Sequence, residues 1–509
     1  MAISTAVGLE RISRVVGYMI KKGNFQNVTP YLPQRVAILG EANTANQSGL
    51  TVDPFEFTTA KEVGDKFGYG SPLHQMARIL RPINGSGLGG IPTIIYPQLV
   101  DVAATATTIT YGITGTATKN KTHYVVISGR DNVDSEIYAI NIASGDSAAT
   151  VITKVIAAVN AVLGCPVIAS AGADIVFTTK WKGVTSKETN ISIDVDGDSA
   201  GIVYAQSAKV DGAGVVSLAD TTPLMVNEWN TIVVNQYGTD QISALEVFNG
   251  VPDQTAPTGR YAGTIFKPFI SLFGSVLDDK ADLIAITDAA ARKDQVTHVL
   301  CPAPGSSGYT WEAAANVCVL LAPVLQNTPH LDVNAKSYPD MPVPADGDIE
   351  DMADYDNRDY LVKRGCSTVN LTNGKYTIQD LITTYHIDGE VPPQYRYVRN
   401  LNIDWNIRYK YYLLEQINVV DHSIAESDQA IRVDGVIKPK QWKQVITSMA
   451  EECASQNLIV DLAFMVASIV VETSETNPDR LETAFSYKRS PLARIASTTA
   501  TAGFAFGIK

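Results

Sequence analysis

Residues 34–41, Gln-Arg-Val-Ala-Ile-Leu-Gly-Glu, form a short apolar run that stops at a glycine, and this pattern predicts a buried strand. The next periodic segment, residues 71–80, predicts a helix, with Ser71 as its N-cap and Pro72 in its first turn. Residues 93–96, Thr-Ile-Ile-Tyr, predict a second strand. Strand, helix and strand in this order indicate an α/β unit.

This unit is interrupted and then resumes. Residues 101–220 are rich in Thr, Ala and Gly, with near alternation of apolar residues, and they predict an inserted, outward-facing β-rich domain. Beyond the insertion, apolar runs at 231–234, 283–287 and 296–300 predict further strands, and 240–249 and 310–326 predict helices. We therefore expect a split α/β domain made of residues 31–100 plus 221–340.

A C-terminal α+β domain is expected over residues 341–484, after a Pro- and Asp-rich boundary. Its pattern predicts a helix at 356–365 and a hairpin at 367–378, with a type I′ turn at Asn373-Gly374. It also predicts long helices at 400–420 and 441–456, and a strand-like run at 458–473.

Both ends of the chain differ from the rest, because they are basic and β-prone. Residues 1–30 predict an N-terminal linking arm and residues 485–509 a C-terminal one. A short strand is not stable alone and needs a partner sheet, so we expect both arms to dock on adjacent subunits. The expected inter-subunit contacts are Val15, Val16, Tyr18, Ile20, Phe485 and Tyr487.

Composition excludes several functional classes. The 509 residues carry 40 Lys+Arg and 53 Asp+Glu, a net charge of −13, which disfavours nucleic acid as a partner. Five scattered cysteines without a CxxC motif exclude a disulfide framework. We find no secretory signal and no run long enough to cross a membrane, so we expect a soluble protein made in a cytoplasm.

No motif supports catalysis, a cofactor or a metal. Residues 85–90, Gly-Ser-Gly-Leu-Gly-Gly, satisfy G-x-G-x-x-G, but a helix precedes and a strand follows, which reverses the order that nucleotide binding requires. Residues 194–198, Asp-Val-Asp-Gly-Asp, are similar to a calcium loop, but the glycine comes too early. The chain has no Walker A or H-E-x-x-H motif. We therefore predict a protein that is not an enzyme.

Acidic residues cluster between positions 340 and 360. Such a run is a solvated face, a metal site or a docking patch for a basic arm. The residues of the candidate docking patch are Asp346, Asp348, Glu350, Asp351 and Asp354.

Several segments together resemble one protein family. Residues 67–76, Phe-Gly-Tyr-Gly-Ser-Pro-Leu-His-Gln-Met, are similar to a segment of contractile tail sheath proteins of myophages, in the Mu-type branch. The predicted hairpin that leads into Ile-Thr-Thr-Tyr at 382–385 resembles the C-terminal sheath signature, and residues 400–411 match the helix that follows it.

This resemblance implies a structural subunit without catalytic residues. Sheath subunits form hexameric rings, stacked as a helix around a tail tube, and their arms add strands to neighbouring subunits. On a signal from the baseplate the sheath contracts and drives the tube through the host envelope. The implied partners are other copies of the chain, the tube, the baseplate and the tail terminator. The implied location is the virion tail, with assembly in the host cytoplasm.

Two alternatives stay open: the sheath of a phage-derived contractile injection device, and a different structural virion protein. Neither involves membrane insertion.

Overall fold

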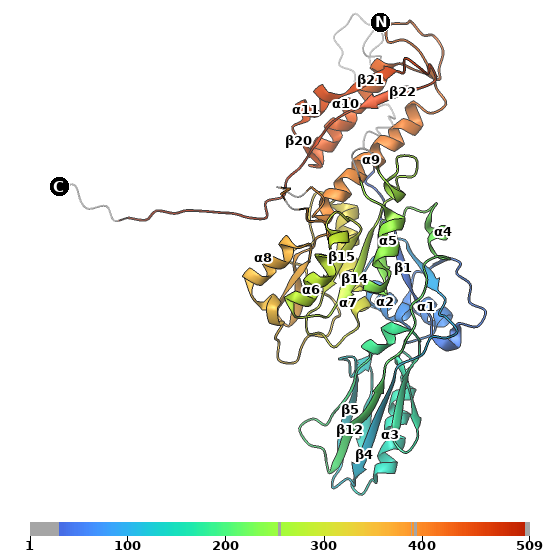
Figure 1. Cartoon of the computed structure of the whole chain (residues 1–509), viewed down its shortest axis with the longest axis vertical. Helices are drawn as coiled ribbons and strands as arrows, with labels where there is room; N and C mark the ends of the chain where they lie inside the picture. The colour runs from blue at the N-terminus through green and yellow to red at the C-terminus, as the bar shows by residue number, and fades with distance from the viewer. Residues whose placement is uncertain (1–29, 253–255, 388, 391–393, 504–509) are drawn as a thin grey trace, which may run out of the picture.

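The computed structural model describes residues 30–252, 256–387, 389–390 and 394–503. The chain is a mixed α/β protein with several sheets, and it is elongated (Figure 1). The β-rich insertion lies at one end, the main α/β sheet in the middle, and the C-terminal helices and strands at the other end.

The central sheet combines strands from before and after the insertion. Five parallel strands have the order β15-β14-β13-β1-β3, and β2 adds an antiparallel edge next to β3. Two parallel strands precede the insertion and three follow it. Their bounds are β1 Val36–Glu41, β2 Phe55–Glu56, β3 Thr93–Gln98, β13 Ile232–Asn235, β14 Ile270–Ser275 and β15 His298–Pro302.

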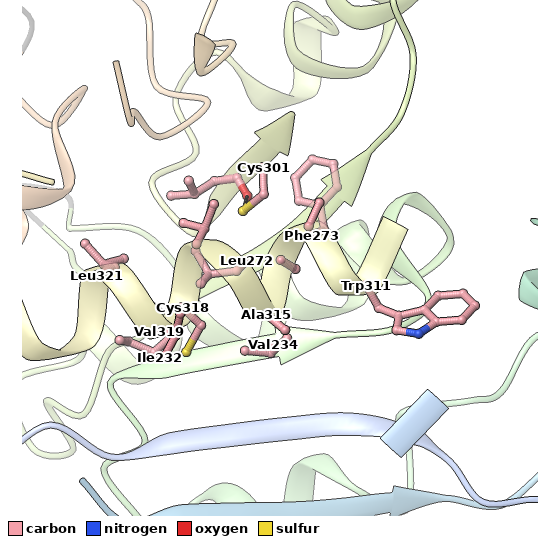
Figure 2. Close-up of a cluster of buried hydrophobic side chains, with 14 of the residues drawn as sticks. Ile232, Val234, Leu272, Phe273, Cys301, Trp311, Ala315, Cys318, Val319 and Leu321 are labelled. Atoms are coloured by element: carbon pink, nitrogen blue, oxygen red, sulfur yellow. Dashed lines mark hydrogen bonds between the residues drawn. The ribbon is translucent and has the colours of Figure 1, made fainter. Parts of the chain in front are cut away.

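Helices cover both faces of this sheet. α2 (Pro72–Leu80) begins as predicted, since the Ser71 side chain accepts a hydrogen bond from the His74 N–H. α7 (Thr310–Asn327) lies along one face, and its buried side chains pack on β13, β14 and β15 (Figure 2). The other helices around the sheet are α1 Ala60–Phe67, α4 Thr222–Met225, α5 Ile242–Asn249 and α6 Lys280–Thr287.

Gly274 of β14 allows α7 to approach the sheet closely. A Cβ at this position would lie 1.7 Å from the carbonyl oxygen of Thr310, the first residue of α7. Any side chain here would therefore push the helix away from the strands.

One predicted strand is wrong. Residues 283–287 lie in α6, whose N-cap Asp279 accepts a hydrogen bond from the Ala281 N–H. The missing strand is β14, which lies between β13 and β15. A short apolar run has no periodicity that separates a strand from a helix, and in α6 only Leu283 and Thr287, one turn apart, are buried.

The insertion has two larger sheets, a two-stranded sheet of β6 and β7 and one α-helix, and its core is a separate hydrophobic cluster. Its sheets have the orders β12-β4-β10-β9 and β11-β5-β8. The bounds are β4 Thr108–Gly115, β5 Lys121–Ile127, β6 Asn132–Val133, β7 Glu136–Ile137, β8 Ala139–Ile142, α3 Ala148–Ala161, β9 Val167–Ala171, β10 Ile175–Thr179, β11 Ile191–Asp194 and β12 Ile202–Val210.

The residues that follow position 340 still belong to the main hydrophobic core. A separate hydrophobic core forms farther along the chain. Residues of η6, of the predicted hairpin and of the first half of α9 belong to the same hydrophobic cluster as the central sheet. α10 and the strands after it form a second cluster on the other half of α9. The predicted domain boundaries stay a prediction.

The elements of this part are η6 Glu350–Ala353, α8 Tyr355–Lys363, β16 Thr368–Thr372, β17 Lys375–Asp380, α9 Val398–Asn418, β18 Ser423–Ile424, β19 Val436–Ile437, α10 Pro439–Ser455, β20 Ile459–Val460, α11 Leu462–Ser468, β21 Val470–Thr473, β22 Leu481–Ala484 and β23 Lys488–Arg489.

The predicted turn is confirmed, because Asn373 and Gly374 both have positive φ. The predicted strand-like run at 458–473 is wrong in its middle, where Asp461 caps the helix α11.

The insertion is joined to the core by an aromatic and ionic contact at the start of α7. Trp181 is fully buried, and its ring lies 5.7 Å from Tyr309 and 5.8 Å from Trp311. Arg130 of the insertion donates to Asp340 at 2.6 Å and lies 3.4 Å from Glu312. The base of the insertion is thus part of the main core.

We predict that Trp181→Ala lowers the free energy of unfolding by about 3–5 kcal/mol, because it removes a buried ring that joins two cores. Urea denaturation followed by circular dichroism measures the change. Val203→Ala, at an exposed position of β12, is the control and should change stability by less than about 0.5 kcal/mol. Equal stability of the two variants would contradict this role of Trp181.

Candidate functional site

The C-terminal segment is held by the body of the subunit as far as Arg494 and leaves it afterwards. We call residues 485–494 the tail root and residues 495–503 the C-terminal tail. The root starts directly after β22, which pairs with β21 as a hairpin, and it contains β23, which pairs with β20.

Aromatic packing fixes the beginning of the tail root. The Phe485 ring lies 5.6 Å from Tyr411 of α9 and 6.3 Å from Tyr487. Tyr411 in turn lies 5.6 Å from Trp442 of α10. The root therefore joins the hydrophobic cluster between α9 and α10.

Asp404 of α9 is the main ionic contact of the tail root. Arg489 binds it with two hydrogen bonds, Nε to Oδ1 at 2.7 Å and Nη2 to Oδ2 at 2.6 Å. The Tyr487 hydroxyl donates to Oδ1 at 2.9 Å. Burial disfavours the charged form of Arg489, but the adjacent Asp404 carboxylate outweighs burial and raises the pKa of the guanidinium above its usual value.

Two further contacts hold the end of the root. Arg399 donates to the Ser490 carbonyl oxygen at 2.7 Å and to its hydroxyl at 2.6 Å, and Ser490 is only 2% exposed. Arg494 forms an ion pair with Asp332, lies 3.4 Å from Asp380, and stacks on the Tyr397 ring at 3.6 Å. Burial raises the pKa of Asp380, although Arg494 opposes this shift.

The C-terminal tail begins immediately after Arg494. Ile495 is 89% exposed, and every residue from 495 to 503 is exposed and outside helix and strand. Figure 1 shows this segment as a thread that runs away from the subunit. This segment has no strand partner among the described residues.

The structure locates only some of the predicted arm residues. Phe485 and Tyr487 lie in the tail root, where they contact their own subunit. Val15, Val16, Tyr18 and Ile20 lie outside the described residues. The inter-subunit role of all six stays a prediction.

Some carboxylates of the acidic segment accept hydrogen bonds from nearby residues of the same subunit. Asp351 accepts a hydrogen bond from the Lys280 N–H at 2.9 Å and another from Asn357 at 3.0 Å. Asp354 caps α8 by accepting from the Asp356 N–H. Asp346, Asp348 and Glu350 are exposed in consecutive turns. Asp354 is exposed as well, so four of the five predicted patch residues lie on the surface, and Asp346, Asp348 and Asp354 each accept one local backbone hydrogen bond.

The two weak motifs have structural roles. At the loop similar to a calcium site, Lys121 lies 2.6 Å from Asp196, and Lys119 pairs with Asp198. Lysines therefore supply the positive charge there, and the described residues contain no group of three or more side chains suited to a metal ion. The glycine-rich loop 85–90 connects α2 to β3, and Arg81 donates hydrogen bonds to the carbonyl oxygens of Gly89 and of Ile91, the residue after the loop.

In parallel α/β sheets, ligands bind beyond the carboxyl ends of the strands. Here the base of the insertion fills part of that region, next to β1 and β13. Gln236 donates to Thr185 of the insertion at 2.8 Å and to Glu41 at 3.3 Å, and Thr185 accepts from Trp181. Burial raises the pKa of the Glu41 carboxyl to about 8, although hydrogen bonds from Tyr237 and Gln236 oppose the shift.

Sequence reasoning missed Asp404, Arg399 and Asp332, which hold the tail root. No spacing rule links them to it, because they lie 85, 91 and 162 residues from their partners Arg489, Ser490 and Arg494. The basic character of the segment was the only usable signal. In the described part of the chain, no helix has the length and hydropathy of a membrane span.

No family model and no curated protein matches the chain. Among solved structures, the chain is similar to a sheath tail protein from Desulfitobacterium hafniense, with 10% identity, coverage of 93% of this chain and 99% of the other, and a TM-score of 0.43. It is also similar to a chain of the anti-feeding prophage baseplate in the contracted state, with 10% identity, coverage of 96% and 97%, and a TM-score of 0.45.

A further similar chain comes from the helical sheath of the anti-feeding prophage in the contracted state. It has 9% identity and a TM-score of 0.40, and the match covers 96% of this chain and 99% of that one.

We predict that Glu41 makes the subunit less stable as pH rises from about 5 to 9. The folded pKa lies above the ordinary value, so the folded state binds the extra proton in this window and loses it as pH rises. The slope for one such group is at most about 1.4 kcal/mol per pH unit.

Urea unfolding of the wild type and of Glu41→Gln across pH 5–9 tests this, since other titrating groups cancel in the difference. The wild type should lose stability relative to the variant as pH rises. Parallel profiles would mean that Glu41 ionises normally.

Proposed function

We propose that this chain is the structural subunit of a contractile tail sheath. Copies would assemble as stacked hexameric rings around a tail tube, between a baseplate and a tail terminator, and the assembly would contract to drive the tube through a host envelope. The subunit would form in the host cytoplasm and end in the virion tail. The sequence resemblance to the Mu-type branch supports this assignment.

The observation that carries the proposal is the exposed C-terminal tail on a firmly held root. Ion pairs and buried hydrogen bonds end at Arg494, and the tail then offers unpaired backbone groups together with the exposed side chain of Ile495. A rigid body with a projecting segment suits a polymer whose subunits move while their connections persist.

The subunit also has edges that can receive a strand. The hairpin β21–β22 is a two-stranded sheet among the described residues, so each of its strands has one edge without a neighbouring strand. An incoming segment can hydrogen-bond to such an edge, and side-chain pockets then select its sequence. We assign the tail of one subunit, and the predicted N-terminal arm, to the edges of neighbouring subunits.

Charge supports a second contact. The first 35 residues hold Arg11, Arg14, Lys21, Lys22 and Arg35 against the single acid Glu10. The exposed Asp346, Asp348 and Glu350 on an adjacent copy would attract such an arm. We propose this acidic patch, with Asp351 and Asp354 at its border, as the docking surface of a basic arm.

The energy for contraction would be conformational. Two packings of the same subunit need to differ by only a few kcal/mol, and a long polymer adds up this difference. A kinetic barrier would hold the extended form until a signal arrives. This mechanism needs no catalytic group, and we assign none.

Purified protein should polymerise into hollow, helically striated tubes that negative-stain electron microscopy detects. Deletion of residues 495–509 should leave a folded subunit that forms no tubes, because it removes the donated segment and keeps the root. Circular dichroism and light scattering measure folding and assembly.

Deletion of residues 485–509 is the matched comparison. It should also lower the melting temperature, because it removes the contacts to Asp404 and Arg399. Normal tubes from the 495–509 deletion would refute the role of the tail, and a wild-type chain that stays monomeric under all salt conditions would refute the sheath assignment.

A further inference from the structure

Three asparagines of the chain are followed directly by glycine, namely Asn84, Asn249 and Asn373. In such a pair the backbone nitrogen of the glycine can attack the side-chain amide carbon of the asparagine, because glycine has no Cβ to block the approach and a flexible backbone that permits it. The structure gives the three asparagines very different surroundings. These surroundings decide where the reaction can occur in the folded protein.

The fold protects Asn249, the last residue of α5. Its side chain is fully buried. Its Nδ2 donates to the Phe269 carbonyl oxygen at 2.8 Å and to the Thr297 hydroxyl at 2.9 Å, and its Oδ1 accepts from the Phe269 N–H at 3.0 Å. Rotation of this amide toward Gly250 would break all three bonds without water to replace them, which is costly for a buried polar group.

Asn373 is exposed, but it is restrained by the hairpin turn between β16 and β17. Thr372 and Lys375 on either side of the turn are paired in the ladder. Asn373 has φ of 54° and Gly374 has φ of 70°. Attack by the glycine nitrogen rotates the backbone between these two residues, so the turn must open first. We therefore expect a slow reaction at this position.

Asn84 lies in the loop between α2 and β3 and has no such restraint from helix or strand. Asn84, Gly85 and Ser86 are exposed, and the preceding Ile83 is 91% exposed. A Cβ at Gly85 would meet no atom within 4 Å, so the space around this glycine is open. The Gly85 N–H donates to the Pro82 carbonyl oxygen at 3.0 Å. This bond lies inside the same exposed turn, and it must open before the attack.

Ser86 directs two donors at the amide oxygen of Asn84. Its hydroxyl lies 2.6 Å from Oδ1, and its N–H lies 3.0 Å from the same atom. Negative charge develops on Oδ1 when the Gly85 nitrogen attacks Cγ. Donors that already point at this atom stabilise the charge as it forms.

We propose that Asn84 is a site of spontaneous deamidation in the folded protein and that Ser86 accelerates the reaction. The Gly85 nitrogen forms a bond to Cγ of Asn84 and loses its proton to solvent. The side-chain nitrogen takes up a proton and leaves as ammonia, which closes a succinimide ring.

One water molecule then opens the ring at either of its carbonyl carbons. Opening at Cγ of residue 84 restores the ordinary main chain and leaves aspartate. Opening at the main-chain carbonyl carbon leaves isoaspartate, in which the chain runs through the former side chain. The steps involve only hydrolysis, so they need no oxidant, reductant or cofactor.

Both products add one negative charge to the loop, and isoaspartate also adds one carbon to the main chain between α2 and β3. Because the ammonia is lost, asparagine does not form again in water. The converted fraction therefore increases with the age of the molecule. This inference is independent of the proposed sheath function, and neither one fails with the other.

Incubation of the folded full-length protein at neutral pH tests the proposal, with digestion and peptide mass spectrometry at intervals. The peptide that contains Asn84 should gain the mass difference between Asp and Asn severalfold faster than the peptide that contains Asn373. Asn249 should convert only after the protein is unfolded in urea. Conversion of Asn84 no faster than that of Asn373 would overturn the proposal.

The variant Ser86→Ala tests the role of the hydroxyl, with folding checked by circular dichroism. It should slow conversion of Asn84 about threefold, because it removes one hydrogen bond from the developing charge. Asn373 is the internal control and should convert at an unchanged rate. Equal rates at Asn84 in the folded wild type and the folded variant would contradict the assignment of Ser86 and overturn the proposal.

A synthetic peptide of residues 79–90 separates the effect of the sequence from that of the loop structure. In the peptide the loop geometry is lost, so Ser86→Ala should change the rate at Asn84 much less than in the folded protein. An equal slowing in peptide and protein would mean that the folded loop contributes nothing, and it would also overturn the proposal.

Discussion

The carboxylate of Asp404 on α9 is the contact on which the exposed end of this protein depends. It binds Arg489 through two hydrogen bonds and Tyr487 through a third, so its charge is fully compensated in a half-buried site. Removal of one partner from such a group leaves a poorly solvated charge, which is strongly destabilising. With Arg399 and Arg494, this contact determines where the folded subunit stops and where the tail starts.

A second constraint acts at the opposite side of the central sheet. The region beyond the strand ends, where related topologies bind ligands, contains Thr185 and Trp181 from the base of the insertion. Among the described residues no cation forms an ion pair with Glu41, and burial raises the pKa of its carboxyl to about 8. The insertion therefore is not only an addition to the surface of the subunit. Its base contributes side chains to the core of the central sheet.

Together these features describe a subunit with a rigid centre and a projecting connection. α7 packs on the central sheet through almost all of its length (Figure 2). The ionic contacts of the root attach the tail to α9, whose first half belongs to the main core. A force on the tail would reach that core through Asp404 and Arg399. Under the proposed sheath function, this connection would carry movement from one copy of the chain to the next.

Local chemistry determined much of the structure. Ser71 and Pro72 begin a helix, Asn373-Gly374 closes a hairpin, and long periodic runs become α7, α9 and α10, because capping, turn geometry and periodicity act within a few residues. Short apolar runs such as 283–287 and 458–473 carry no such information, and only packing decided between strand and helix. The basic C-terminal segment was visible in the sequence, but its partners Asp404, Arg399 and Asp332 were not. Those groups meet only through tertiary folding, since contacts between residues far apart in the chain leave no pattern in a single sequence.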